Sequence, residues 1–427
     1  PNLDALAARS VDFRRHHIGS FPTVPTRADY FTGQYSFANA IGWGGLPKDI
    51  PNVPQLLQYG GVTTAGVVDT PFFRIKGYNW DRGFDFFYDL ELQQVGQLTT
   101  DPRHRNPSRL VPEPWITEFD HAAPQTMTLA EKCVEQLVDR DRFFLYVDTW
   151  DPHEPWDAPI WYGKRYKADF QGRNIKPAYG NYAEHGLSDD DLAEATAAYK
   201  GKMTMVDRWI GRLLDRIDSM GLLDDTAIVF TTDHGFNFGE RGGQFGKMIA
   251  GPAEDGERRW LRSPLHREIV EIPLLISIPG VETRQESRLS GAIDIAPTIA
   301  DLFGIEAQDW MHGRSLLDYV RSADAAEDDV IVSAMPLGVP GRASVSVVDD
   351  VTRSVIEWQP ITVAAGKWVM LFATWDDPIE LYDTEADPDW LNNVASAHSD
   401  IVKELHAKMV AQLRRAGADA EQLEARS

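Results

Sequence analysis

The sequence has almost no cysteine and no long hydrophobic segment. Its 427 residues include one cysteine, Cys133, so a disulfide framework and a thiolate metal cluster are both excluded. No apolar run approaches the ~18 residues of a membrane-spanning helix. No signal peptide is visible at the start of the chain. These absences predict a cytoplasmic protein that does not enter a membrane.

Basic residues are also scarce. The chain has 42 Lys and Arg against 65 Asp and Glu, which gives a formal net charge of −23. Proteins that bind nucleic acids neutralise phosphates with Lys and Arg, and an anionic membrane surface repels an acidic protein. The composition therefore argues against nucleic acid and membrane as partners.

Strand-like and helix-like segments alternate over the first part of the chain. Apolar strands are expected at 61–69, 143–150, 226–232 and 272–278, and helices at 128–139 and 293–303. The clearest helix begins after Ser188, which is a good N-cap because Asp191 follows three residues later. This alternation predicts an α/β fold with a doubly wound, mostly parallel sheet.

The pattern changes after the acidic segment 324–329, which we interpret as a linker. Beyond it, short alternating strands at 345–348, 354–358, 368–373 and 379–382 precede a helix at 398–414. We therefore expect a catalytic domain at 1–323 and a small C-terminal domain at 330–427, with an antiparallel sheet and a helix.

Thr23 and Arg27 form the first candidate site. Thr23 is placed like the N-cap of a helix, with Pro25 in the first turn. Free N–H groups and the helix dipole favour an anion there, and Arg27 can contact two oxygens of a tetrahedral oxyanion. The pattern indicates an anion site with a built-in nucleophile, although a threonine that merely caps a helix is an alternative interpretation.

Three further polar segments follow predicted strands, where ligands collect in doubly wound sheets. Asp233 and His234 pair a hard oxygen ligand with an imidazole, which suits a divalent metal. His153 lies in a proline-flanked loop and can donate to a leaving oxygen or an oxyanion. Lys247 offers a point charge. Taken singly, each is equally well an ordinary loop or surface residue, and we interpret the nearby Asp148 and Asp151 as shaping the turn.

In this order the segments resemble the sulfatases of the alkaline phosphatase superfamily. The signature of a nucleophile, any residue, Pro, any residue and Arg stands here as Thr23-Val24-Pro25-Thr26-Arg27, followed by Thr32-Gly33. Further matches are Asp151-Pro152-His153-Glu154-Pro155-Trp156, Asp233-His234-Gly235, Gly239-Glu240, Gly246-Lys247, Asp294-Ile295-Ala296-Pro297-Thr298, Glu380-Leu381-Tyr382-Asp383 and Asn392-Asn393. The resemblance implies a sulfatase-like fold, catalytic roles for Thr23, Arg27, His153 and Lys247, and a metal held by Asp233, His234 and the Thr23 hydroxyl.

Two departures from the family pattern change what is expected. The family's nucleophile is a Cys or Ser oxidised to formylglycine, whereas this chain has Thr23. Related members of the superfamily use unmodified Thr or Ser on phosphate esters, so Thr23 shifts the expected chemistry towards phosphoryl transfer. The family also has a strand with an Asp-Asp pair before the segment that begins here at Pro1. We expect that the natural protein is longer than the given sequence, rather than catalytically crippled.

The sequence thus predicts a metal-dependent hydrolase that cleaves a sulfate or phosphate ester through a covalent intermediate on Thr23. We expect one divalent cation, with Ca²⁺ favoured and Mn²⁺, Zn²⁺ or Mg²⁺ as alternatives. The expected partner is a small anionic ester, with an aryl or sugar group; the oligomeric state stays open. Alternatives are a phosphodiesterase or phosphonate-ester hydrolase with an unmodified Thr nucleophile, and a non-catalytic binding protein or inactive truncated homologue.

Overall fold

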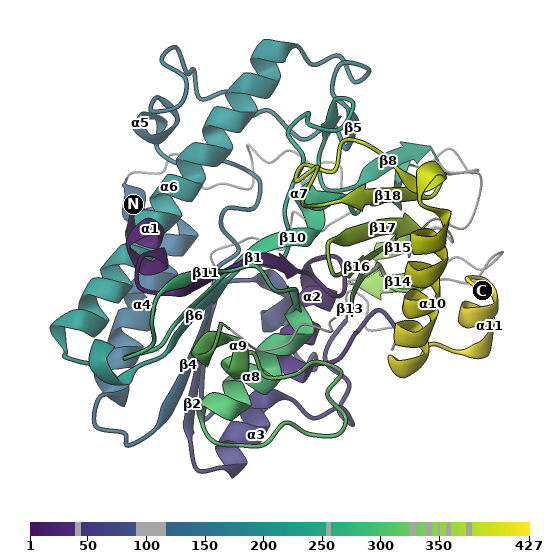
Figure 1. The fold of residues 1–427 in the computed structure, drawn as a ribbon. Helices are drawn as coiled ribbons and strands as arrows, with labels where there is room; N and C mark the ends of the chain where they lie inside the picture. The colour runs from purple at the N-terminus through teal and green to yellow at the C-terminus, as the bar shows by residue number, and fades with distance from the viewer. Residues whose placement is uncertain are drawn as a thin grey trace.

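The computed structural model describes residues 1–38, 44–90, 117–252, 258–323, 330–337, 344–348, 351–355, 360–372 and 378–427 (Figure 1). Its helices are α1 (Asn2–Ala7), α2 (Thr23–Thr32), α3 (Val53–Tyr59), α4 (Ala122–Leu137), α5 (Ile160–Gly163), α6 (Asp189–Ser219), α7 (Arg267–Val270), α8 (Ile295–Leu302), α9 (Leu317–Arg321), α10 (Ser399–Arg415) and α11 (Ala420–Glu424). Its strands are β1 (Val11–His17), β2 (Thr63–Val68), β3 (Phe86–Asp89), β4 (Phe143–Asp148), β5 (Gly180–Asn181), β6 (Ile228–Thr231), β7 (Gln244–Phe245), β8 (Ile249–Pro252), β9 (Arg258–Arg262), β10 (Glu271–Ser277), β11 (Arg284–Glu286), β12 (Ser290–Gly291), β13 (Val330–Ser333), β14 (Ser344–Val348), β15 (Val351–Val355), β16 (Ile361–Ala365), β17 (Trp368–Phe372) and β18 (Glu380–Asp383).

Two sheets form the centre of the first part of the chain. One has the order β3-β2-β4, and both of its pairings are parallel. The other has the order β11-β1-β10-β6, with β12 also paired to β1. In this sheet β11 and β12 run parallel to β1, while β10 is antiparallel to both β1 and β6. The predicted α/β class with parallel strands is confirmed, and β10 is an antiparallel strand within it.

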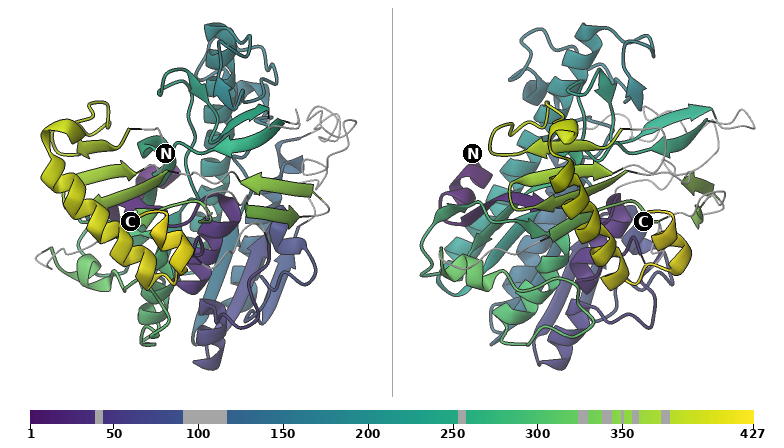
Figure 2. Two further views of the ribbon diagram at one scale, coloured as in Figure 1. Left: turned by 90° about the vertical axis from the view of Figure 1, so that its right-hand side faces the viewer. Right: turned by 45° about the vertical axis from the view of Figure 1, so that its right-hand side comes forward.

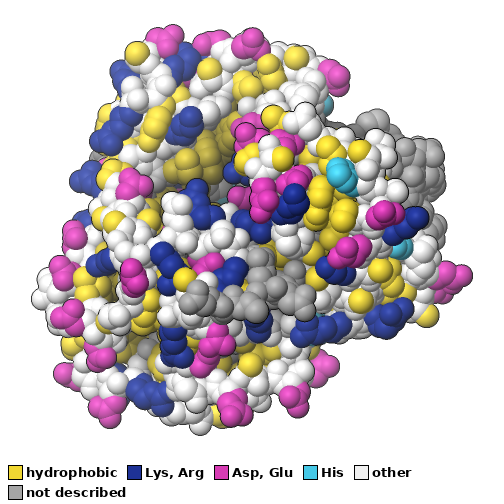
Figure 3. Space-filling view, in the orientation of Figure 1, with side chains coloured by type: hydrophobic (Ala, Val, Ile, Leu, Met, Phe, Trp, Pro, Cys, Tyr) yellow, Lys and Arg dark blue, Asp and Glu magenta, His cyan; other side chains and the backbone are white. Residues whose placement is uncertain are grey.

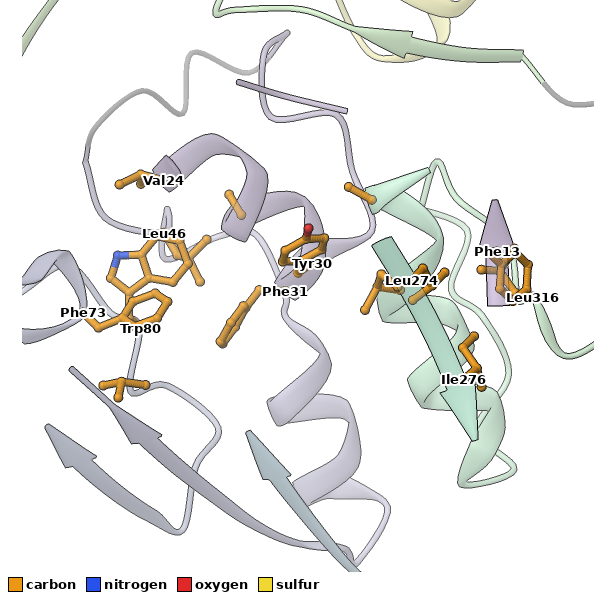
Figure 4. Close-up of a cluster of buried hydrophobic side chains, with 14 of the residues drawn as sticks. Phe13, Val24, Tyr30, Phe31, Leu46, Phe73, Trp80, Leu274, Ile276 and Leu316 are labelled. Atoms are coloured by element: carbon orange, nitrogen blue, oxygen red, sulfur yellow. The ribbon is translucent and has the colours of Figure 1, made fainter. Parts of the chain in front are cut away.

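Helices cover both faces of the strands, as the alternation of side chains along β4 shows. Leu145 and Val147 pack in a cluster with residues of α4 and α6, whereas Tyr146 on the opposite face packs against the cluster around α2. Figure 4 shows this second cluster, with Tyr30 and Phe31 of α2 near Leu274 of β10. The helix α2, which begins at Thr23, is therefore buried among side chains from both sheets.

The helix expected after Ser188 is confirmed. The Ser188 hydroxyl accepts a hydrogen bond from the Asp191 N–H at 3.2 Å, and the Asp191 carboxylate accepts one from the Ser188 N–H at 2.9 Å. This reciprocal capping starts α6, which continues to Ser219. Cys133 is buried in α4.

The C-terminal part contains the predicted antiparallel sheet and helix. The strands β13, β16, β17 and β18 pair in that order, each antiparallel to its neighbour. The helix α10 packs against this sheet and is visible beside it in both views of Figure 2. Part of the predicted strand at 354–358 lies outside the described residues, and β15 covers its beginning.

The C-terminal sheet shares a core with the earlier part of the chain. Ile18 and Phe21, just before α2, are buried in one cluster with Ile331 of β13 and Val369 of β17. The backbone of Phe21 also donates to the Ala334 carbonyl at 2.8 Å. The predicted linker, 324–329, lies outside the described residues, so the division into domains at 1–323 and 330–427 stays a prediction. Across the described ranges, no helix combines the length and the apolar character needed to cross a membrane.

Candidate active site

The loop before α2 is held by a buried carboxylate. Asp29 accepts hydrogen bonds from the backbone N–H groups of Ser20 (2.6 Å) and Ser36 (2.9 Å) and from the Ser20 hydroxyl (2.9 Å). Burial raises the pKa of Asp29 to about 7 although these hydrogen bonds oppose the shift. Pro22 is the N-cap and Thr23 is the first helical residue, so the expectation that Thr23 caps the helix is wrong. A threonine that is not needed as a cap is free for other contacts.

The Thr23 side chain meets His234, which follows β6. Thr23 Oγ1 lies 3.2 Å from His234 Nε2, and His234 Nδ1 lies 3.0 Å from the carbonyl oxygen of Gly235. Because a carbonyl only accepts, Nδ1 carries the hydrogen and the neutral ring has its lone pair on Nε2. The Thr23 hydroxyl therefore donates to Nε2. Burial lowers the pKa of His234 to about 4, which keeps the ring neutral at pH 7.

The glycine after His234 is required by close backbone packing. A Cβ on Gly235 would lie 1.9 Å from the carbonyl oxygen of Glu268, and the Gly235 N–H donates to the Ile269 carbonyl at 3.0 Å. The backbone at 235 thus lies directly against the segment before β10. This contact fixes the turn that presents Asp233 and His234.

Arg27 connects the two strand ends through two carboxylates. Its Nη1 donates to Asp233 Oδ2 at 2.5 Å and to the Thr23 carbonyl at 3.1 Å. Its Nε and Nη2 donate to the two oxygens of Asp148 at 2.8 and 3.2 Å. Burial alone would raise the pKa of Asp233, but attraction to His234, Arg27 and Lys247 outweighs burial and holds this pKa well below its usual range. Asp233 is therefore an anion, and its Oδ2 lies 3.6 Å from the His234 Nε2 that accepts from Thr23.

Asp148 is a site residue that sequence reasoning missed. It is the last residue of β4, and its carboxylate also accepts hydrogen bonds from the hydroxyls of Tyr146 and Thr70. The sequence pattern indicates a residue that shapes the turn, but Asp148 holds the guanidinium of Arg27. The two residues are separated by 121 positions, so no local pattern could have paired them. Its place at the carboxyl end of a strand was the one available signal.

His153 and Lys247 form a second group. Lys247 Nζ lies 3.3 Å from His153 Nε2, and the imidazole of His153 stacks on Trp150 with ring centroids 4.1 Å apart. His153 Nδ1 lies 2.8 Å from the Glu154 carbonyl oxygen. Burial is the main cause that lowers the pKa of His153 to about 4. The charge of Lys247 also lowers the pKa values of Asp233 and His234. The two groups of predicted site residues therefore interact electrostatically.

Glu154 and Tyr179 were also missed from the sequence. The Tyr179 hydroxyl donates to Glu154 Oε1, and Glu154 Oε2 lies 3.3 Å from His153 Nδ1. Burial would raise the pKa of Glu154, but His153, Lys247 and Tyr179 lower it to about 2. The carboxylate is therefore ionised. Glu154 occupies the variable position of the predicted Pro-His-x-Pro stretch, which gave no reason to select it.

Asp151 has a structural partner of its own. It lies 3.2 Å from Lys202 Nζ, which also contacts Asp157 at 2.5 Å, and all of these contacts are buried or half-buried. The Asp151 carboxylate accepts from the Ala123 N–H at 3.3 Å. Lys202 thus ties the start of the His153 loop to α6.

The three predicted metal ligands lie together but supply only part of a coordination sphere. Thr23 Oγ1 and Asp233 Oδ2 lie 3.2 and 3.6 Å from His234 Nε2. Within the described part of the chain, no three His, Cys, Asp or Glu side chains are grouped so that they could hold a metal ion. Ca²⁺ takes about six to eight oxygen ligands. These three donors could therefore occupy one side of the coordination sphere of a divalent cation.

Charged side chains of both signs are mixed over the face seen in Figure 3. The net charge of −23 does not describe the site, where Arg27 pairs with Asp148 and Asp233 and the charge of Lys247 also acts on Asp233.

Comparisons with known proteins identify the family. The family model described as Sulfatase matches residues 1–305. A choline-sulfatase of Rhizobium meliloti (strain 1021) is 24% identical over 92% of this chain and 77% of the relative. A multifunctional alkaline phosphatase superfamily protein of Trinickia caryophylli is 25% identical over 75% of this chain and 71% of the relative.

A solved structure extends the likeness to the whole fold. The phosphonate monoester hydrolase from Silicibacter pomeroyi superimposes with a TM-score of 0.72 at 21% identity, covering 98% of this chain and 91% of that structure. The family match covers more than half of the chain and includes Thr23, Arg27, His153, Asp233, His234 and Lys247. The chain belongs to the sulfatase family of hydrolases, within the alkaline phosphatase superfamily.

Proposed function

We propose that the protein hydrolyses a small sulfate or phosphate ester, with the unmodified hydroxyl of Thr23 as the nucleophile. The observation that carries the proposal is the hydrogen bond from Thr23 to His234 Nε2, at 3.2 Å, in a tautomer fixed by the Gly235 carbonyl. A nucleophile within hydrogen-bond reach of an oriented acceptor is the usual arrangement for covalent catalysis. Arg27 and Lys247 supply the positive charge that an anionic ester needs.

In the first step Thr23 Oγ attacks the sulfur or phosphorus atom and the bond to the leaving alcohol oxygen breaks. The hydroxyl proton leaves to His234 Nε2, and the leaving oxygen takes up a proton from solvent. The products are an alcohol and a Thr23 ester. Water then attacks the same sulfur or phosphorus atom and releases one proton to solvent, the bond to Thr23 Oγ breaks, and Thr23 Oγ regains its proton from His234 Nε2.

Arg27 contributes to this step through its charge more than through bidentate contact. Four of its five N–H groups already donate, to Asp148, Asp233 and the Thr23 carbonyl. Among the described residues no acceptor meets the second N–H of Nη2, which leaves it for an oxygen of the ester. The bidentate contact predicted from the sequence is made with Asp148 in this structure.

We propose that Asp233, His234 and Thr23 bind one divalent cation, with Ca²⁺ favoured and Mn²⁺, Zn²⁺ or Mg²⁺ as alternatives. When bound, the cation supplies charge that polarises the ester oxygens and lowers the pKa of the Thr23 hydroxyl. The ionised Asp233 and the neutral His234 have the protonation states that such binding requires.

The kind of ester is the next question. The relatives include a choline-sulfatase, whereas the solved structure named above is a phosphonate monoester hydrolase. An unmodified Thr23 favours phosphodiester or phosphonate-ester hydrolysis over sulfate-ester hydrolysis. The reason is that a simple alcohol nucleophile leaves an ester that only water can cleave. Rates on nitrophenyl sulfate, nitrophenyl phosphate, a nitrophenyl phosphodiester and a nitrophenyl phosphonate would rank the candidates directly.

Substitution of Thr23 tests the nucleophile. We expect Thr23→Ala to lower kcat by at least about 10³-fold while the protein stays folded, and Thr23→Ser to retain measurable turnover. Thr204→Ala is the matched control, because the half-buried Thr204 hydroxyl donates to the Lys200 carbonyl within α6 and contacts the Tyr166 hydroxyl. Wild-type activity in Thr23→Ala would show that the nucleophile is a different group.

A further inference from the structure

The segment that contains α5 is basic, although the protein as a whole is acidic. Residues 158–177 contain five Lys and Arg and one Asp, a formal charge of +4, whereas the whole chain has a formal charge of −23. Charges further apart than about 8 Å are largely screened from each other at physiological ionic strength. A partner that approaches α5 therefore responds to this local charge, and the net charge does not exclude an anionic membrane at this surface.

Two of these cations are exposed and have no carboxylate partner among the described residues. Lys167 and Arg173 pair with Asp190 of α6, at 3.1 and 2.6 Å, whereas no described carboxylate lies within ion-pair distance of Lys164 or Arg165. Asp190 itself lies about 16 Å along α6 from the residues that α5 contacts. The charge of Lys164 and Arg165 is therefore available to an anion outside the protein.

Large apolar side chains are exposed beside these two cations. Ile160 and Trp161, at the start of α5, are 45% and 54% exposed, and Tyr166, which follows α5, is 50% exposed. Met203 of α6 is 38% exposed. Figure 3 shows hydrophobic and basic side chains interspersed over α5 and α6, at the upper left. Large apolar side chains that gather on the surface of a folded protein usually mark a binding surface.

Close packing holds α5 and Tyr166 against α6. A Cβ on Gly201 would lie 2.9 Å from the backbone nitrogen of Gly163, so glycine allows the two helices to approach closely. The Tyr166 hydroxyl lies 2.5 Å from Thr204 Oγ1, and Thr204 is the neighbour of Met203. The exposed residues of α5 and α6 therefore belong to one surface, which lies at the margin of the molecule in Figure 1.

This mixture of side chains fits a lipid surface better than a soluble anionic polymer. Anionic headgroups attract Lys and Arg, and each such residue near the membrane strengthens binding about fivefold. Trp and Tyr collect at membrane–water interfaces because their rings are apolar and one end is polar. Ile160 and Met203 add aliphatic groups, which are stabilised at the boundary of the acyl chains. A hydrated polymer offers these aliphatic groups no apolar partner.

We propose that this surface binds the headgroup region of an anionic lipid membrane. This α5 surface consists of Ile160, Trp161, Lys164, Arg165, Tyr166 and Met203. Ile160 and Trp161 enter the boundary between headgroups and acyl chains, while Lys164 and Arg165 contact the lipid phosphates. The α5 surface lies on the membrane and does not cross it. The inference does not involve Thr23 and is independent of the proposed function.

Co-sedimentation with lipid vesicles tests the proposal. We expect the wild-type protein to bind vesicles of phosphatidylcholine with phosphatidylserine, and to bind pure phosphatidylcholine vesicles at least about tenfold more weakly. Binding should weaken as salt is raised, because salt screens the attraction. Lys164→Gln combined with Arg165→Gln should weaken binding to the anionic vesicles about 30-fold, which is about fivefold for each cation. Trp161→Ser should weaken it about tenfold, because less apolar area is buried.

Exposed residues outside the α5 surface supply matched controls. Lys403→Gln combined with Arg414→Gln removes the same two charges from α10, and Tyr59→Ser removes an aromatic side chain that is 80% exposed. We expect both controls to bind the anionic vesicles within about twofold of the wild-type protein. Thermal unfolding of every variant checks that the loss of binding is not a loss of structure.

A dye at position 160 tests insertion directly. Cys133 is the only cysteine in the chain and is buried, so Ile160→Cys can be labelled selectively with a dye whose emission shifts to the blue in apolar surroundings. We expect a blue shift when the anionic vesicles are added. The same dye on Tyr59→Cys should show no shift.

The proposal is wrong if the wild-type protein does not bind the anionic vesicles, or if the variants of the α5 surface bind them as tightly as the wild-type protein. It is also wrong if the dye at position 160 stays in water while the protein is bound. Tighter binding to dextran sulfate than to the vesicles, unchanged in Trp161→Ser, would assign the surface to an anionic polymer instead. None of these results depends on Thr23, so this proposal and the proposed function fail separately.

Discussion

Replacement of Asp148 by alanine should destabilise the protein strongly. Asp148 and Arg27 side chains are 9% and 8% exposed, and two hydrogen bonds of 2.8 and 3.2 Å join them. Asp148→Ala leaves the Nε donor of Arg27 and the hydroxyls of Tyr146 and Thr70 buried without this acceptor. Removing one partner of a buried ion pair costs about 3–5 kcal/mol. Because Asp233 still neutralises part of the Arg27 charge, we expect the lower end of that range.

Urea denaturation of matched variants measures this effect. Asp148→Asn keeps one oxygen acceptor and should cost about 1–3 kcal/mol in the free energy of unfolding. Asp12→Asn is the control, because its partner Arg14 is 58% exposed and such surface pairs contribute about 0–1 kcal/mol. A loss of less than about 1 kcal/mol in Asp148→Ala would refute the reasoning, since it would mean that Arg27 finds water or another acceptor at no cost.

Two further predictions concern buried charge. His17 is 1% exposed, and burial lowers its pKa to about 3. Between about pH 6.5 and 3 the unfolded chain therefore binds a proton on His17 that the folded chain does not. The contribution of neutral His17 to the free energy of unfolding is complete above pH 6.5 and is lost as the pH falls. His17→Phe should therefore reduce the slope of the unfolding free energy against pH, below pH 6.5, by up to about 1.4 kcal/mol per pH unit, which corresponds to one proton. An unchanged slope would show that His17 is not kept neutral in the folded protein. Lys202→Met should cost about 3–5 kcal/mol in urea denaturation because Asp151 and Asp157 lose their buried cation, whereas Lys408→Met, which removes an exposed i,i+4 pair with Glu404, should change stability by less than about 1 kcal/mol.

Local patterns in the sequence located several of the longer elements. Apolar runs located β2, β4, β6 and β10, and the Ser188 cap located the start of α6. The strand β1 was missed because five of its seven residues are polar, namely Asp12, Arg14, Arg15, His16 and His17. His16 and His17 are nevertheless buried, which a hydrophobic pattern cannot indicate. The fold places β1 between β10 and β11, and this tertiary position overrides the local composition.

From the sequence, the candidate site was predictable only for the residues that lie in a motif. Thr23 and Arg27 lie on one helix, and Asp233 and His234 are adjacent, so spacing alone brought each pair together. The contact of Thr23 with His234 and that of His153 with Lys247 depend on the sheet and loops. Asp148, Glu154 and Tyr179 act through partners or positions that no spacing rule reveals. The hydrogen bond between His153 and the Glu154 carbonyl is likewise a product of the folded loop.

The central claim is that Thr23 becomes covalently esterified during turnover. Rapid acid quench of the wild-type protein mixed with a nitrophenyl sulfate or phosphate ester, followed by mass spectrometry of the peptide containing Thr23, tests it most directly. The account predicts a peptide heavier by one sulfuryl or phosphoryl group, located on Thr23, that forms with the nitrophenol burst and disappears when substrate is exhausted. Turnover with the group on another residue, or turnover retained in Thr23→Ala, would contradict it.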